Sequence, residues 1–238
     1  MKIEICSDSL ESVIMANKVG ANSIELCSCM TLGGVTPSSA LIKKAVEISE
    51  IPIHCLIRPR EGHFVYNDYE FNTIINDIKD AKKNGVKGVV IGVLTKDFNI
   101  NITQLDKIIK VSKGLKITFH RAFDSIVDSE KAIDLLSKIG INRILSSGKA
   151  NKAVKGIKNL INWKNYNSKI LIQPGGGIDK NSALLFKNEA FESIHLSGSQ
   201  EEKWKGPIPK SIDKTFIKQT VRRPSFKKMK DIIEIAKN

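Results

Sequence analysis

Residues 2–27 read KIEICSDSLESVIMANKVGANSIELC. At the two ends of this stretch, 2–6 and 23–27, apolar residues alternate with polar residues or cysteine, which is the pattern of a β-strand with two different faces. Residues 9–19 lie between them and form an amphipathic pattern that predicts a helix. Two strands joined through a helix run parallel, so this stretch predicts the βα unit of an α/β protein.

The βα pattern recurs along the chain until eight units are complete. We expect the remaining strands at 52–58, 88–91, 116–120, 143–146, 169–173 and 193–196, and the helices between them at 37–49, 68–84, 102–112, 128–139, 152–163 and 180–188. No Pro-rich or Ser-rich linker divides the series. Eight units without a break predict a single-domain TIM-type (β/α)8 parallel barrel, and a doubly wound sheet is the alternative.

The last part of the chain departs from the βα pattern. We expect the barrel to occupy residues 1–200 and a C-terminal basic segment to occupy 201–238, with eleven Lys and Arg residues and three prolines. Residues 225–237 place apolar side chains at helical spacing. We expect this final helix to close the ring of helices around the barrel.

The charge of the chain is strongly positive, with 38 Lys and Arg against 25 Asp and Glu and a net charge of +13. Only six of the basic residues are Arg, and no basic run is interleaved with aromatic residues. Recognition of phosphate or guanine favours Arg forks, and binding of single strands favours aromatic side chains that stack on bases. The composition therefore indicates a solvated lysine surface and does not favour nucleic acid as a partner.

The cellular compartment is suggested by the N-terminus and by the cysteines. The first twelve residues, MKIEICSDSLES, contain no apolar run of the kind found in a signal peptide, and no stretch reaches the 18 or so apolar residues of a membrane span. All four cysteines lie in the first quarter of the chain, a poor arrangement for disulfides in a fold of this size. We expect a cytoplasmic protein with free thiols and no membrane partner.

The alternation along each strand predicts which side chains point into the barrel. Apolar residues of one parity should pack outward against the helices: Ile3, Ile5, Ile24, Leu26, Ile53, Cys55 and Ile57. The other parity turns polar residues inward, and we expect one pocket at the carboxyl ends of the strands to collect Glu4, Cys6, Glu25, Cys27, Arg58 and His120. A barrel core built only for stability is filled with Val, Ile and Leu, so this interior indicates a site.

Cys6 and Cys27 are the candidate metal ligands. They end neighbouring strands with the same inward parity, and neighbouring strands lie about 4.8 Å apart, so both sulfurs can reach one ion. Two thiolates suit Cu(I) better than Zn, which takes four ligands. The alternative is that both are small buried apolar residues. Cys55 should face the helices and be inert, and Cys29 is either a further ligand or a loop residue.

A second group of residues at the same pocket suggests an enzyme. Glu25, His120 and Asp124 are candidate catalytic residues because carboxylates and imidazole move protons, and Arg58 and Arg121 are candidates for holding an anionic substrate. The alternative is an internal network of ion pairs that only orders the mouth of the barrel.

Glycines and serines follow the last three strands, where TIM barrels often bind phosphate with backbone amides. The candidates for binding an anion there are Ser147, Gly175, Gly176 and Ser197. Tight turns after strands also require glycine, so this signal is weaker than the cysteine pair.

A series of motifs runs in order through about 200 residues: ICSDS at 5–9, IELCS at 24–28, GGVTPS at 33–38, IRPR at 57–60, TFHRAFD at 118–124, SSG at 146–148, QPGGGI at 173–178 and HLS at 195–197. With these motifs the chain resembles the CutC copper homeostasis proteins. The resemblance implies a TIM-type barrel, a cytosolic location, a role in copper handling, and Cys6 and Cys27 as the copper ligands. The chain departs from the family pattern at Cys29, where the family has Gly after Cys-Ser.

We therefore expect a cytosolic copper homeostasis protein that binds Cu(I) through Cys6 and Cys27 and uses no organic cofactor. The alternative is a TIM-barrel enzyme that acts on a small anionic or phosphorylated molecule with Glu25, Arg58, His120 and Asp124. The sequence leaves open whether the protein forms a homo-oligomer.

Overall fold

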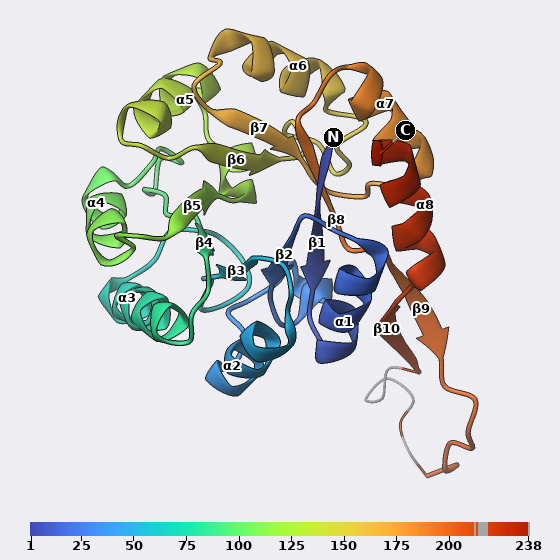
Figure 1. Ribbon diagram of the computed structural model, residues 1–238. Coiled ribbons are helices and arrows are strands. Elements are labelled where there is room, and N and C mark those ends of the chain that lie inside the picture. The colour runs from blue at the N-terminus through green and yellow to red at the C-terminus, as the bar shows by residue number, and fades with distance from the viewer. Residues whose placement is uncertain (212, 214–218, 238) are drawn as a thin grey trace.

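Eight parallel strands form a barrel surrounded by helices in the computed structural model, which describes residues 1–211, 213 and 219–237 (Figure 1). The strands are β1 (Lys2–Ser7), β2 (Ser23–Leu26), β3 (Ile53–Leu56), β4 (Gly88–Ile91), β5 (Lys116–Phe119), β6 (Arg143–Ser146), β7 (Leu171–Pro174) and β8 (Ser193–Leu196). Each strand pairs with the next in sequence, and β1 also pairs with β8. A single bridge between Gly175 and His195 joins the remaining edges. The TIM-type barrel is confirmed, and the doubly wound sheet is wrong.

The helices are α1 (Leu10–Val19), α2 (Ser39–Ile48), α3 (Asp68–Lys83), α4 (Ile102–Val111), α5 (Ser129–Lys138), α6 (Ile157–Tyr166), α7 (Lys180–Asn188) and α8 (Phe226–Lys237). Most begin at an Asn, Asp or Ser whose side chain accepts a hydrogen bond from the first turn, which satisfies a backbone amide that has no partner within the helix. The helix pattern of the sequence is therefore reinforced at its starts by capping.

Predicted boundaries were wrong by more than one residue in four elements. β3 ends at Leu56, not at 58, and α6 ends at Tyr166, not at 163. Three elements begin two or more residues later than predicted. α2 begins after the cap Ser38, not at 37. β7 begins at Leu171, not at 169, because the Lys169 amide donates to Asn167 Oδ1 in a turn. α6 begins at Ile157, not at 152, because a turn precedes it in which a Cβ on Gly156 would lie 2.1 Å from the Ser147 carbonyl oxygen. That close packing of backbone requires glycine.

The two faces of the strands carry different residues, as the alternation predicts. The outward residues Ile3, Ile5, Ile24, Leu26, Ile53, Cys55 and Ile57 are all buried in the main apolar core together with residues of the helices. The inward residues Cys6, Cys27, Leu56 and Val90 form a separate small apolar cluster. The interior also holds His54, for which β4 makes room: a Cβ on Gly88 would lie 2.7 Å from the His54 ring.

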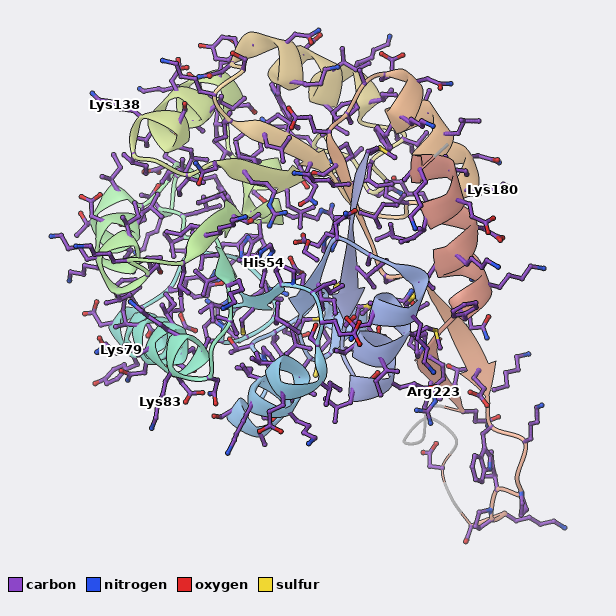
Figure 2. The ribbon with its side chains drawn as sticks, viewed as in Figure 1. His54, Lys79, Lys83, Lys138, Lys180 and Arg223 are labelled. Atoms are coloured by element: carbon purple, nitrogen blue, oxygen red, sulfur yellow. The ribbon has the colours of Figure 1, made fainter. Side chains whose placement is uncertain are left out.

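The lysines lie on the outside of the ring. Lys79 and Lys83 on α3, Lys138 on α5 and Lys180 on α7 extend away from the barrel, whereas His54 lies within it (Figure 2). This placement fits the solvated basic surface predicted from the composition. No helix within the described residues combines the length and the apolar character that crossing a membrane requires.

The C-terminal segment adds a hairpin that the sequence did not predict. β9 (Ser199–Lys203) and β10 (Thr220–Pro224) pair antiparallel and project from the barrel beside α1 and α8 (Figure 1). Their residues are mostly exposed and charged, so they lack the apolar alternation of a half-buried strand. α8 packs between α7 and α1 and so occupies the eighth position of the helix ring. Lys214 and Lys218 of this segment lie outside the described residues.

Candidate functional site

The carboxyl ends of the strands surround a cavity of about 570 Å³, which we call the mouth. Its wall brings together most of the residues singled out in the sequence, namely Cys6, Glu25, Cys27, Arg58, His120, Arg121, Asp124, Gly176 and Ser197, and adds Met30, Gly177, Ile178, His195 and Arg222. The expectation that Glu4 joins them was wrong. Glu4 precedes Cys6 by two residues on β1, so it lies deeper and lines a second cavity of about 590 Å³ at the other end of the barrel.

The thiols of Cys6 and Cys27 are neighbours, with 3.7 Å between their sulfur atoms. They come from adjacent strands paired in the register Cys6 to Glu25, which places Cys27 just beyond the end of β2. Leu56, Val90 and Met30 pack around them. Cys6 is 9% exposed and Cys27 is fully buried, so the mouth gives access to the pair through Cys6.

The Cys6 thiol is protonated when no cation is present. Sharing a hydrogen bond with Cys27 raises the pKa of Cys6 well above its usual value, and burial and the charge of Glu25 raise it further. A soft cation that binds between the sulfurs would replace the thiol protons, because only the thiolate is a metal ligand.

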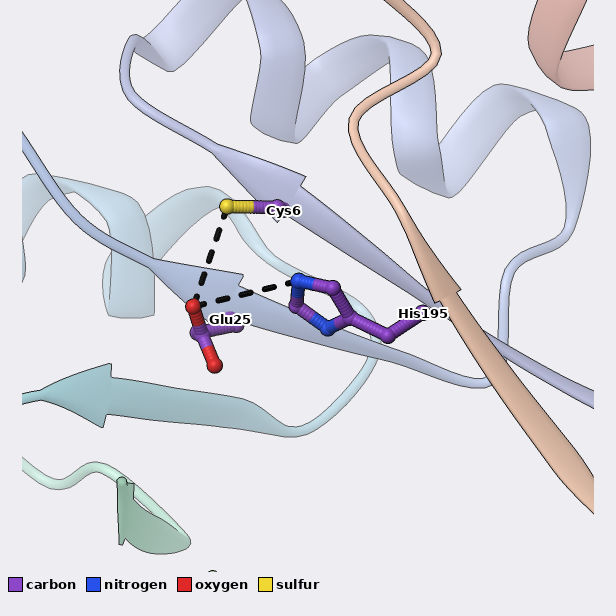
Figure 3. A group of neighbouring side chains, drawn as sticks. All are labelled: Cys6, Glu25 and His195. Atoms are coloured by element: carbon purple, nitrogen blue, oxygen red, sulfur yellow. Dashed lines mark hydrogen bonds and ion pairs between the residues drawn. The ribbon is translucent and has the colours of Figure 1, made fainter. Parts of the chain in front are cut away.

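Glu25 and His195 lie beside Cys6 (Figure 3), and Cys27 completes a cluster of four possible donors. Glu25 Oε1 lies 3.7 Å from Cys6 Sγ and 3.9 Å from His195 Nε2. One ligand atom from each of Cys6, Glu25 and His195 lies within 4.8 Å of the other two. Burial raises the pKa of Glu25. His195 was not among the candidate site residues of the sequence, and the pairing of β8 with β1 places it in this cluster.

Glu4, which lies deeper in the barrel, orients the ring of His195. Its carboxylate accepts hydrogen bonds from His195 Nδ1 at 3.2 Å and from His54 Nδ1 at 2.7 Å, and forms an ion pair with Arg143 at 3.2 Å. Burial alone would raise the pKa of Glu4, but Arg143, His195 and His54 hold it well below its usual value. Since Nδ1 of His195 is engaged with Glu4, Nε2 is left facing Glu25 and the mouth, as in histidines that bind metals with a carboxylate behind them.

His195 also titrates unusually. Burial alone would lower its pKa, but the carboxylates of Glu25 and Glu4 outweigh burial and raise it. The two carboxylates therefore favour the protonated, positively charged form of the ring. A metal ion at Nε2 would take over that charge.

His120 lies in the mouth as a neutral ring. Its Nδ1 accepts a hydrogen bond from the Ala122 amide, which leaves the proton on Nε2. Burial, together with the nearby charge of Arg58, lowers the pKa of His120 to about 3. Within the described residues Nε2 has no hydrogen-bond partner. His120 is thus placed to donate a hydrogen bond to a bound molecule.

Arg58 differs from what its expected role requires. Its Nη1 donates to the carbonyls of Leu32 and Gly34, and its Nη2 donates to the carbonyl of Gly62. The guanidinium therefore ties two loops of the mouth together and does not present a free fork to an anion.

Asp124 and Arg121 belong to η2 (Arg121–Ser125), a short 3-10 helix after β5. The Asp124 carboxylate accepts from Arg121 Nε and from the amides of Ser147 and Lys149, so it holds the turn after β6. The Ser147 hydroxyl is also bonded to Asp124. Neither Ser147 nor Gly175, whose amide donates to the Ser146 carbonyl, lies on the cavity wall. Arg121 and Asp124 therefore line the mouth, whereas Ser147 and Gly175 do not.

The turn after β7 presents backbone amides to the mouth. Gly176 and Gly177, with φ values of +110° and +68°, line the cavity together with Ile178. Among the described residues, the amides of Gly176, Gly177 and Ile178 donate no hydrogen bond. A Cβ on Gly176 would lie 3.5 Å from Arg121 Nη1, so a cation lies directly beside these amides. This arrangement can hold an anion.

The other two cysteines lie away from the mouth. Cys55 is fully buried in the outer core, and burial raises its pKa well above the usual value, as expected for an inert thiol. Cys29 is exposed, is not part of the cavity wall, and has a φ of +52°, a conformation that favours glycine. All four cysteines are free.

Comparison with known proteins gives a consistent result. Residues 1–200 match the model of the CutC family. A CutC protein of Pasteurella multocida (strain Pm70) is 44% identical over 202 residues, covering 83% of this chain and 82% of the relative, and one of Aliivibrio fischeri (strain MJ11) is 40% identical over 202 residues, with the same coverage.

Solved structures agree with this match. The crystal structure of a Streptococcus agalactiae protein that is described as the copper homeostasis protein CutC superposes with a TM-score of 0.79. The two sequences are 32% identical, and the match covers 83% of this chain and 98% of that chain. The aldolase QR15 superposes with a TM-score of 0.62 over 83% of this chain and 89% of its own, but at 14% identity it shows the fold alone.

Proposed function

Because the chain belongs to the CutC family, we propose that it serves copper homeostasis and binds Cu(I) as cargo at the mouth of its barrel. The observation that carries this proposal is the 3.7 Å separation of the Cys6 and Cys27 sulfurs, with Cys6 open to the mouth. Soft thiolates select Cu(I), and two of them are enough to hold it.

The remaining donors refine the site. His195 Nε2, oriented by Glu4, would supply a third ligand, and Glu25 lies beside Cys6 and His195. Two sulfurs, one imidazole and one carboxylate favour Cu(I) over Mg or Ca, which take oxygen ligands. The site requires reduced cysteines, so we place the protein in the cytoplasm, where thiols stay reduced.

The test is a titration of Cu(I) against a competing chelator under reducing conditions. Cys6→Ser and Cys27→Ser should each remove most of the Cu(I) binding, because each takes away one of the two thiolates. Cys29→Ser is the matched control, since that thiol is exposed and lies outside the mouth, and it should bind as the parent does. Equal losses in all three variants would mean non-specific binding by thiols and would contradict the proposal.

A second candidate function is the binding of a small anionic molecule in the same mouth. It is favoured by the three free amides of the turn after β7 beside Arg121. An enzyme that uses this site would have His120 as a neutral hydrogen-bond donor and Glu25 as the group with a raised pKa, while Arg58 and Asp124 hold the loops. Inorganic phosphate is the simplest probe of this candidate.

A further inference from the structure

The copper donors and the anion-binding groups share one cavity. Cys6, Glu25 and His195 line the mouth together with Gly176, Gly177 and Arg121. Its volume of about 570 Å³ is far larger than a metal ion needs and falls within the range of sites for small molecules. A single ligand that carries both a metal and negative charge would use both halves of this cavity.

Arg222 adds a second cation to the mouth from outside the barrel. It belongs to β10, beyond residues 1–200 that match the family, and yet it lines the cavity. The next residue, Arg223, points the other way and pairs with Glu11 of α1 at 3.6 Å and with Glu202 at 3.7 Å. Arg223 thereby fixes the hairpin against α1, and the alternation of β10 turns Arg222 toward the mouth.

Arg222 forms no ion pair within the described residues. It stands opposite Glu201 in the pairing of β10 with β9, and its charge also acts on the half-buried Asp8, where it lowers the pKa of the carboxyl.

Arg121, whose side chain is 44% exposed, uses Nε for Asp124 and Nη2 for Ser147 and Ala150. Its Nη1, beside Gly176, is the atom that can meet a small anion together with Arg222. Arginine in such positions recognises carboxylate and phosphate groups.

The copper site itself demands a docked donor. Cys27 is fully buried and Cys6 is only 9% exposed, so copper reaches the pair through one partly open sulfur. Cu(I) is a soft ion that small thiols hold tightly. A carrier thiol that delivers Cu(I) directly to Cys6 has to occupy the mouth while the ion passes from its sulfur to the Cys6 sulfur.

We propose that the mouth accepts Cu(I) as its complex with a small anionic thiol, and that Arg222, Arg121 and the free amides of Gly176, Gly177 and Ile178 hold the anionic groups of this carrier. The inference rests on the proposed function and names the form in which its cargo arrives.

The transfer is an exchange of ligands without a change of oxidation state. A bond forms between Cu(I) and Cys6 Sγ, and then one forms with Cys27 Sγ, while the bond from Cu(I) to the carrier sulfur breaks. Of the two protons that the Cys6 and Cys27 thiols release, one passes to the carrier thiolate, which leaves the mouth as the free thiol, and the other passes to solvent. Copper remains Cu(I) throughout.

The test compares two copper donors on the full chain in stopped flow, following the absorbance of the new Cu(I)–thiolate bonds. One donor is Cu(I) bound to mercaptosuccinate, a dianionic thiol, and the other is Cu(I) bound to 2-mercaptoethanol, a neutral thiol. The measured quantity is the ratio of the two transfer rates, in the parent and in variants. Dividing the rate ratio of each variant by that of the parent cancels the difference between the two donors in their affinity for copper.

The parent should favour the anionic donor, and Arg222→Gln should lower the rate ratio about tenfold, the effect of losing one charge-assisted contact. The matched control is Lys203→Gln, which removes one positive charge from the same hairpin away from the mouth wall and should leave the ratio unchanged. Equal ratios in Arg222→Gln and Lys203→Gln would overturn the inference and leave copper binding intact. A parent that takes copper from neither donor would overturn the proposed function itself.

Discussion

Glu4 Oε2 accepts a hydrogen bond from His195 Nδ1 at 3.2 Å, although the two residues are 191 positions apart in the sequence. The contact exists because β1 pairs with β8, which brings the first strand beside the last. It joins an ionised carboxylate deep in the barrel to the ring that faces Cys6 and Glu25 at the mouth. The orientation of a candidate copper ligand thus depends on closure of the fold.

Replacing Glu4 with Gln should destabilise the protein by about 3–5 kcal/mol, because it leaves Arg143 and His195 buried without their shared counter-charge. The free energy of unfolding from denaturant titration measures this loss. Glu11→Gln, which removes an exposed ion pair with Arg223, should cost less than about 1 kcal/mol. If the two variants lost the same free energy of unfolding, the buried network around Glu4 would contribute no more to stability than an exposed ion pair does.

His120 should make the protein less stable as the medium becomes acidic. Its pKa is about 3 in the folded chain and about 6.5 when unfolded, so between these values the unfolded state binds one more proton. The stability that comes from keeping His120 neutral is complete above the unfolded pKa and is lost as pH falls toward the folded value, by up to about 1.4 kcal/mol per pH unit. The free energy of unfolding of the parent, measured from pH 7 to pH 4, should therefore fall as the pH falls. The slope of this dependence should be smaller in His120→Gln.

The control for this slope is His63→Gln, because His63 is exposed on a loop of the barrel. It should leave the pH dependence as it is in the parent. A slope that persists in His120→Gln would place the acid sensitivity elsewhere.

Glu25→Gln should make Cys6 more reactive. Cys27 and burial raise the pKa of Cys6 most, and the negative charge of Glu25 raises it further, so removing that charge should lower the thiol pKa and increase the thiolate fraction. The rate of Cys6 alkylation by iodoacetamide, followed by mass spectrometry of the peptide, should rise relative to the exposed-site variant Glu50→Gln. An unchanged or slower rate would mean that Glu25 is not charged beside Cys6.

Inorganic phosphate should raise the melting temperature of the parent if the free amides after β7 bind anions, since a ligand of the folded state stabilises it by mass action. Arg121→Gln should reduce that shift because it removes the cation beside Gly176. Lys83→Gln, on the outer face of α3, is the control and should keep the full shift (Figure 2). The second candidate function fails if phosphate does not move the parent, or if Arg121→Gln shifts as much as the control.

The alternation of β1 and β2 was enough to predict that Cys6, Glu25 and Cys27 face the same interior, because strand geometry fixes the face of each residue. The same reasoning misplaced Glu4. Parity gives the direction of a side chain and not its height along the barrel, and the step of two residues from Glu4 to Cys6 leads from one cavity to the other.

Other features depend on contacts that the sequence does not encode locally. Arg58 was correctly turned inward, but only the loops at Leu32, Gly34 and Gly62 decide that its guanidinium is occupied by carbonyls. The β9–β10 hairpin has exposed and charged strands without apolar alternation, so Arg222 carried no signal of its place at the mouth.

The most direct test of the central claim is X-ray absorption at the copper edge on protein loaded with one equivalent of Cu(I). The spectrum counts the sulfur atoms bound to copper, independently of affinity. The account predicts two sulfur neighbours in the parent, one in Cys27→Ser, and two again in Cys29→Ser. A parent spectrum without sulfur neighbours, or one that is unchanged when Cys6 and Cys27 are both replaced by Ser, would contradict it.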